Sequence, residues 1–198
     1  MNNTIISLLL RLNSTIAILI FSATISLADG GGGGGGGGAG GGGAGGGSGS
    51  DPSASRCPKG WVWSTASERC VRADSSGLSN DDLYRTGRYL AQSGKYDEAI
   101  FILSHADQSD PKILNYLGYS HRKLGKFEEG FAFYQKALER DPNFLLAREY
   151  LGEGYVATGD YDLALEQLTE IERRCGRQCD QYKKLAAVIS GELESRTW

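Results

Sequence analysis

Residues 118–130 read GYSHRKLGKFEEG, and this stretch recurs twice in altered form. Residues 87–99 read GRYLAQSGKYDEA, and residues 152–164 read GEGYVATGDYDLA. In each copy a glycine recurs after seven residues, an aromatic residue follows two positions later, and a glycine or alanine three positions after that. The copies are offset by 31 and 34 residues, the length scale of a helix–turn–helix solenoid unit. Such units bury their apolar faces by stacking, and the stack offers a surface to partners.

Signals for helix ends surround the three copies. Ser79 and the two residues after it carry side-chain oxygens that can cap the free amides of a first helix. The second glycine of each copy is placed to end the first helix of a pair in the left-handed conformation. Pro111 and Pro142 are expected to close the second helices, because proline cannot continue a helix.

These residues resemble the tetratricopeptide repeat, a family of stacked α-hairpins. The second copy carries most of the characteristic positions of the family pattern: Leu114, Leu117, Gly118, Gly125, Phe127, Gly130, Tyr134, Ala137 and Pro142. The third copy departs from the pattern at Ile171 and Gly176, and the first copy has Thr86 in place of the usual leucine. The resemblance covers about half of the chain and implies an all-α fold.

The fold class predicted here is a short α-solenoid of three such repeats, at about residues 80–110, 111–144 and 145–178. Residues 179–198 are expected to form a capping helix, with Tyr182, Leu185 and Ile189 directed at the third repeat and polar residues around them. A solenoid needs such a polar-backed end for solubility.

The first 28 residues have the pattern of a secretory signal peptide: Arg11, an apolar run, and small residues before a cleavage point after Ala28. The alternative interpretation is a membrane anchor, although the run is shorter than the ~20 residues that span a bilayer. Residues 29–50 are rich in glycine and are expected to be a disordered, flexible linker. We therefore expect an exported protein, periplasmic or at the cell surface or secreted, with no membrane span after cleavage, and a bacterial origin.

The cysteines Cys57, Cys70, Cys175 and Cys179 all lie after the signal segment. An even number of cysteines in an exported chain indicates disulfides, and proximity favours the pairs 57–70 and 175–179. A zinc site is the competing interpretation, but the chain has no Cys-x-x-Cys pair. The second pair brackets Gly176, so its disulfide is expected to hold the capping helix against the third repeat.

Residues 51–77 are expected to form a small knuckle closed by the first of these disulfides. The alternation of Trp61, Val62 and Trp63 places both indole rings on one face of a strand. One interpretation is a platform that stacks on sugars or peptides. The other is that the rings pack onto the helical domain or onto each other.

The resemblance implies that the first helices of the repeats line a groove for peptides. The positions that match this groove are Tyr84, Arg88, Gln92, Asn115, Tyr119, Arg122, Lys123, Glu149, Glu153 and Val156. Arginine, lysine and asparagine side chains there can bind an acidic or C-terminal carboxylate and a peptide amide. The two glutamates can equally neutralise the cations in place.

Composition and motifs argue against several other functions. The formal net charge of −3 gives no support to nucleic-acid binding. The two histidines, His105 and His121, belong to no recognisable triad, and the glycine tract lacks the Lys-Ser/Thr of a phosphate loop. We expect no catalytic residues, cofactor or metal. The predicted function is a non-enzymatic protein- or peptide-binding adaptor of the cell envelope; the alternatives are glycan binding by the tryptophan knuckle and self-association, so a homo-oligomer stays open.

Overall fold

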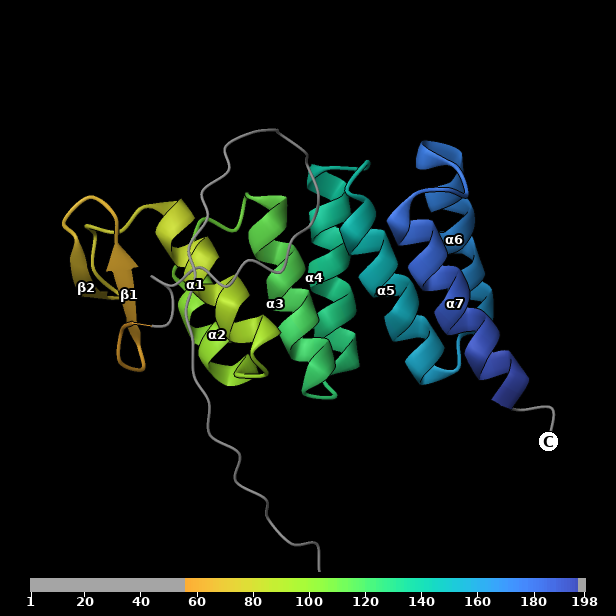
Figure 1. Cartoon of the computed structure of the whole chain (residues 1–198), viewed down its shortest axis with the longest axis horizontal. Helices are drawn as coiled ribbons and strands as arrows, with labels where there is room; N and C mark the ends of the chain where they lie inside the picture. Colours follow the sequence, from red (N-terminus) through yellow and green to blue (C-terminus); the bar gives the residue numbers. More distant parts are fainter. Residues whose placement is uncertain (1–55, 196–198) are drawn as a thin grey trace, which may run out of the picture. The chain divides into compact units, whose positions relative to one another are not determined.

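The computed structural model describes residues 56–195, with side chains described through residue 191. The predicted signal segment and glycine linker lie outside the described residues. Within them the chain forms a two-stranded hairpin followed by seven helices (Figure 1). Their bounds are β1 Trp61–Ser64, β2 Arg69–Arg72, α1 Asn80–Gln92, α2 Tyr96–Ser104, α3 Pro111–Lys123, α4 Phe127–Arg140, α5 Leu145–Thr158, α6 Tyr161–Cys175 and α7 Asp180–Ser195.

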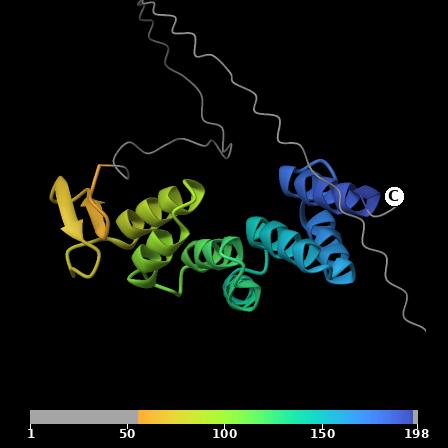
Figure 2. The same ribbon diagram turned by 90° about the horizontal axis from the view of Figure 1, so that it is seen from below.

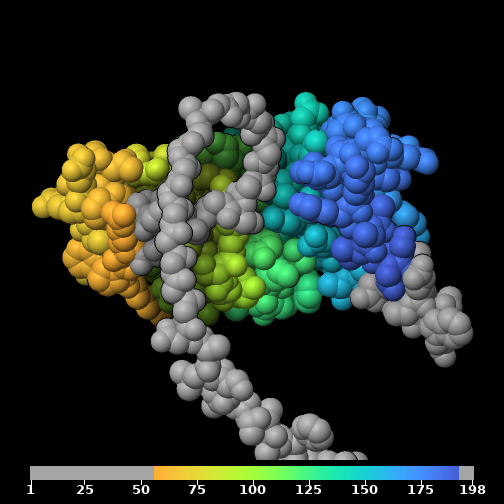
Figure 3. Space-filling view, in the orientation of Figure 1, coloured from red at the N-terminus to blue at the C-terminus, as the bar shows by residue number. Residues whose placement is uncertain are grey.

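The helices pack as three successive pairs, α1 with α2, α3 with α4 and α5 with α6. Each pair contacts the next through α2 and α3 or through α4 and α5, and α7 packs on α5 and α6 (Figure 2). The first helices also contact one another, α1 with α3 and α3 with α5. The stacked α-hairpins predicted from the sequence are confirmed, and the space-filling view shows the surface following chain order from the hairpin to α7 (Figure 3).

Local signals explain where most of these helices begin and end. Ser79 caps α1: its hydroxyl accepts from the amide of Asp82, whose carboxylate accepts from the amide of Ser79. Gly94, Gly125 and Gly159 follow α1, α3 and α5 with φ of +77°, +78° and +86°, as expected for residues that end a helix in the left-handed region.

The expectation for Pro111 was wrong. Helix α2 ends at Ser104, well before this proline, and Pro111 is the first residue of α3. Asp110 precedes it as the N-cap, with a carboxylate oxygen 2.8 Å from the amide of Lys112. Proline suits this position because the first amide of a helix has no partner in the helix. Pro142, in contrast, follows the end of α4 at Arg140, as predicted.

Glycines allow the closest approaches between helices. A Cβ atom on Gly118 would lie 2.9 Å from the ring of Tyr134 and 3.0 Å from the carbonyl oxygen of Gly130. On Gly152 it would lie 2.6 Å from a methyl carbon of Leu185, a residue of α7. Leu185 of the last helix therefore packs directly against Gly152 of the third repeat.

The buried apolar residues form two clusters along the stack. The first joins the hairpin and α1–α3, and the second joins α3–α7, where Leu185 and Ile189 of α7 are buried. Cys175 at the end of α6 and Cys179 just before α7 form a disulfide with an S–S distance of 2.07 Å. The capping helix and its disulfide are as the sequence predicted.

The hairpin is fixed to the first repeat. Cys57 and Cys70 form its disulfide, with an S–S distance of 2.03 Å, and Val62 is fully buried in the first cluster. Asp82 of α1 accepts hydrogen bonds from both the amide and the hydroxyl of Thr65 in the hairpin, at 3.3 and 3.0 Å. The hairpin thus covers the open end of the first repeat.

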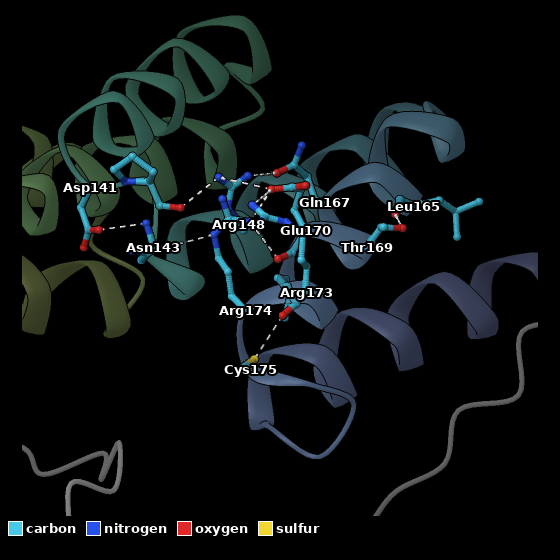
Figure 4. A network of polar contacts seen from close by, with 12 residues as sticks. Asp141, Asn143, Arg148, Leu165, Gln167, Thr169, Glu170, Arg173, Arg174 and Cys175 are labelled. Atoms are coloured by element: carbon cyan, nitrogen blue, oxygen red, sulfur yellow. Dashed lines mark hydrogen bonds and ion pairs between the residues drawn. The ribbon is translucent and has the colours of Figure 1, made fainter.

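A polar network joins the loop after α4 to α5 and α6 (Figure 4). Arg148 donates to the carbonyl oxygen of Pro142 at 3.0 Å and to Gln167 Oε1 at 3.2 Å. Arg174 donates to Asn143 Oδ1 at 3.2 Å and pairs with Glu170. Hydrogen bonds from Arg174 and Arg173 lower the pKa of Glu170 to about 2. These contacts fix the third repeat against the second.

Candidate functional site

A row of tyrosine rings crosses the face formed by the first helices. Tyr84 of α1 lies 5.9 Å from Tyr116 of α3, and Tyr119, one turn further along α3, lies 5.1 Å from Tyr150 of α5 (distances between ring centroids). Tyr116 and Tyr119 are 6.2 Å apart and meet edge to face. Aromatic pairs favour such spacings and angles. We call this surface the tyrosine face.

Cations lie over the rings of the tyrosine face. Lys112 Nζ is 5.6 Å from the ring centroid of Tyr84, and Lys123 Nζ is 5.6 Å from that of Tyr119. Lys112 and Lys123 are solvent-exposed and make no ion pair within the described residues. Tyr116 itself is buried, so the face combines the partly buried rings of Tyr84, Tyr119 and Tyr150 with accessible positive charge.

Arg122, by contrast, is already engaged. Its guanidinium Nη2 lies 2.8 Å from Glu153 Oε2, its Nε donates to the hydroxyl of Tyr134 at 3.4 Å, and only 8% of the residue is exposed. Its Cζ also lies 5.7 Å from the ring centroid of Tyr119 and 5.8 Å from that of Tyr150. Glu153 thus neutralises this cation, one of the two roles the sequence left open for it.

Asn115 is the most unusual residue of the tyrosine face. It is fully buried on α3, and neither Nδ2 nor Oδ1 has a hydrogen-bond partner. Asn115 and Tyr119 are four residues apart and so neighbours on one helix face. A buried polar group without a partner costs free energy and is rare in folded proteins. An amide side chain can accept one hydrogen bond from a peptide N–H and donate one to a peptide carbonyl.

Glu149 of α5 is a second buried polar group here. It is 2% exposed, its Oε2 has no partner, and its Oε1 lies 3.9 Å from Lys184 Nζ of α7. Burial raises the pKa of Glu149 to about 7; the charge of Lys184 opposes this effect and that of Glu153 adds to it. The side chain therefore gains a proton near neutrality and can donate a hydrogen bond.

The remaining predicted positions divide into two kinds. Arg88 is partly buried on α1 with an unpartnered Nε, and Gln92 donates to the hydroxyl of Tyr116 at 3.4 Å, so both border the tyrosine face. Val156 is buried in the second apolar cluster. Tyr116 and Tyr150 were missed as face residues, because the repeat pattern uses neighbouring aromatic residues for packing.

Within residues 56–195, no group of three histidine, cysteine, aspartate or glutamate side chains is placed to hold a metal ion. None of the described helices has the length and hydropathy needed to cross a bilayer. His121 lies 5.2 Å from the ring of Phe133, within the α3–α4 pair, and His105 is exposed after α2.

Comparisons with known proteins agree with this architecture. Residues 111–144 match the tetratricopeptide repeat family model. No curated protein matches the chain by sequence. Among solved structures, the TPR2B domain–pHsp70 complex of yeast Sti1 is similar with a TM-score of 0.54 at 19% identity, over 59% of this chain and 98% of that one.

Two further structures have similar scores. The first TPR of Spaghetti (RPAP3), bound to the HSP90 peptide SRMEEVD, has a TM-score of 0.51 at 19% identity, over 59% of this chain and 94% of that one. The type III secretion chaperone SycD of Yersinia enterocolitica, in complex with a peptide of the translocator YopD, has a TM-score of 0.50 at 20% identity, over 58% of this chain and 89% of that one. Residues 111–144 thus match the tetratricopeptide repeat, and the stack of described helices shares the fold of these solved structures.

Proposed function

We propose that this protein is a non-enzymatic adaptor that binds an extended peptide segment of a partner along the tyrosine face. The observation that carries the proposal is Asn115, whose buried amide has no partner in the fold. A buried polar group without a partner lowers the stability of the fold. Such a group is expected where a bound ligand supplies the missing hydrogen bonds. Three similar folds named above were solved with peptides or in a chaperone complex, which supports this class of ligand.

The chemistry of the face indicates which peptides it prefers. Lys112 and Lys123 present accessible charge above tyrosine rings, while the neighbouring Arg122 is held by Glu153. An acidic side chain or a C-terminal carboxylate binds well to such cations, and an apolar side chain packs against the rings. Asn115 is fully buried, so a peptide reaches its amide only when the side chains that cover it move aside.

The compartment is part of the same proposal. Two disulfides, Cys57–Cys70 and Cys175–Cys179, indicate an oxidising environment. We extend this to export through the signal segment at residues 1–28 and to action in the cell envelope or outside the cell. The glycine linker then serves as a tether between the mature N-terminus and the binding domain.

The test is a selection from a library of octapeptides that are immobilised through their N-termini and carry free C-terminal carboxylates. The mature chain is expected to enrich acidic peptides, and amidation of the selected C-termini is expected to weaken binding at least tenfold. Asn115→Leu, which removes the amide but keeps the volume, is expected to abolish enrichment. Gln108→Leu, an exposed amide between α2 and α3, serves as the matched control and should bind normally.

Two results would overturn the proposal. One is that no peptide is enriched by a chain whose circular dichroism shows the expected helix content. The other is that Asn115→Leu selects the same peptides with the same affinity. Light scattering of the free chain at increasing concentration separates peptide capture from self-association, which predicts a rising mass without any ligand.

A further inference from the structure

A cleft separates the hairpin from the first pair of helices, away from the residues of the tyrosine face. Its larger part, about 390 Å³, is lined by the Lys59–Trp61 segment, Arg72, the Asp97–Glu98 pair and Phe101. A smaller part of about 160 Å³ continues from Trp61 and Glu98 to Tyr89 and Lys95. The combined space falls in the range of small-ligand sites.

Aromatic rings form the apolar walls of this cleft. Trp61 is 39% exposed and Phe101 is 46% exposed, although large aromatic residues are usually buried in folded proteins. Gly60 also lines the cleft: a Cβ atom there would be 3.6 Å from Phe101 Cε1, so a larger residue would narrow the cleft. The opposite face of β1 fixes this arrangement, because Val62 and Ser64 are fully buried.

The polar lining carries three cations, Lys59, Arg72 and Lys95, and two acids, Asp97 and Glu98. The two lysines and the two acids form no ion pair with one another in the part of the chain that the structure describes. Arg72 is neutralised by Asp74 at 3.0 Å. The cleft therefore offers donors and acceptors without a net charge that would select a cation or an anion.

These features match one class of ligand. A pyranose ring has an apolar face of C–H groups that stacks on an aromatic ring, and hydroxyl groups around its edge that both donate and accept hydrogen bonds. Because Arg72 is already paired with Asp74, four lining charges remain, and a charged ligand would be repelled by two of them. We propose that the cleft between the hairpin and α1–α2 binds an uncharged saccharide, with Trp61 and Phe101 as stacking rings and Lys59, Asp97 and Glu98 contacting hydroxyl groups.

The roles of the two hairpin tryptophans differ in this proposal. Both lie on one face of β1, but Trp63 lines neither part of the cleft, and the guanidinium of Arg56 lies 5.6 Å from its ring centroid. Trp61 is therefore the ligand residue and Trp63 its matched control.

The experiment titrates the mature chain with maltotriose, cellotriose and N,N′,N″-triacetylchitotriose, followed by saturation-transfer difference NMR and calorimetry. At least one of the three is expected to bind. Trp61→Ala and Phe101→Ala are each expected to weaken that binding at least tenfold, whereas Trp63→Ala should change it less than twofold. Phe101→Ala lies outside the hairpin, so it tests the cleft even where Trp61→Ala disturbs the hairpin, which circular dichroism and thermal melting report.

Absence of binding by all three sugars overturns the proposal, as does equal loss in Trp61→Ala and Trp63→Ala with none in Phe101→Ala. Choline and sulfate are included as charged probes, and tighter binding of either one refutes the uncharged-ligand assignment. The result is independent of peptide binding: Phe101→Ala should still enrich acidic peptides, and Asn115→Leu should still bind sugar.

Discussion

Arg122 of α3 and Glu153 of α5 form an ion pair across the junction of the second and third repeats, with 2.8 Å between Nη2 and Oε2. The arginine side chain is 7% exposed and the glutamate 22%. Because the pair is largely withdrawn from water, loss of one partner leaves the other charge without compensation. The pair therefore serves to align α3 and α5, and with them the tyrosine face.

A charge swap tests this role. Arg122→Glu and Glu153→Arg each bring like charges together, and each is expected to lower the free energy of unfolding by about 3 kcal/mol. The double variant restores opposite charges and should recover most of the loss. Urea unfolding followed by circular dichroism measures all four proteins, and a double variant no more stable than the singles contradicts the assigned role.

Because other groups approach Gly118 so closely, we expect Gly118→Ala to destabilise the protein. Alanine favours a helix over glycine by about 1 kcal/mol in general. At residue 118 the new methyl group would overlap the ring of Tyr134 and the carbonyl of Gly130, so we expect a net loss of about 1–3 kcal/mol.

Gly191 of α7 is the matched control for this substitution. A Cβ atom there meets nothing within 4 Å, so Gly191→Ala should be neutral or raise stability by up to about 1 kcal/mol. Thermal melts compare the two variants. Equal effects at positions 118 and 191 would show that helix packing does not select glycine at 118.

Glu149 makes stability depend on pH. Its pKa is about 7 in the folded protein, above the ordinary value of 4.5, so the folded state binds the proton more tightly than the unfolded state. The stability of the wild type should therefore fall as pH rises from about 4.5 to about 7. Glu149→Gln removes this titration and should melt several degrees above the wild type at pH 8 but close to it at pH 4.5.

Glu166→Gln, an exposed change on α6, controls for the loss of one charge. It should leave the pH dependence of melting as in the wild type. A wild type and a Glu149→Gln variant whose melting temperatures run parallel from pH 4.5 to pH 8 would rule out the buried, protonated carboxyl.

Much of the fold could be predicted from the sequence because its signals are local and repeated. The spacing of Gly118, Gly125 and Gly130 fixes helix lengths and close approaches within one unit, and three copies of that spacing define a stack. Pro111 was misplaced because proline both stops one helix and starts another. Only the observed end of α2 at Ser104 separates the two roles.

The candidate site was less predictable because it depends on contacts between repeats. Matching to the repeat pattern named Asn115, Arg122 and Glu153, but it could not show that two of them pair and that the third has no partner. The cleft beside Trp61 was also hidden, because Phe101 reaches it from a helix some forty residues later in the chain. Such side-chain partnerships are properties of the packed molecule.

The claim that Asn115 is kept for a ligand and not for the fold has one direct test. Urea unfolding of Asn115→Leu is measured alongside its affinity for a peptide selected by the wild type. Replacing an unpartnered buried amide with an apolar group of similar size should raise the free energy of unfolding by about 1 kcal/mol, while peptide affinity falls at least tenfold. A variant that is less stable than the wild type and binds the peptide as tightly would contradict the account.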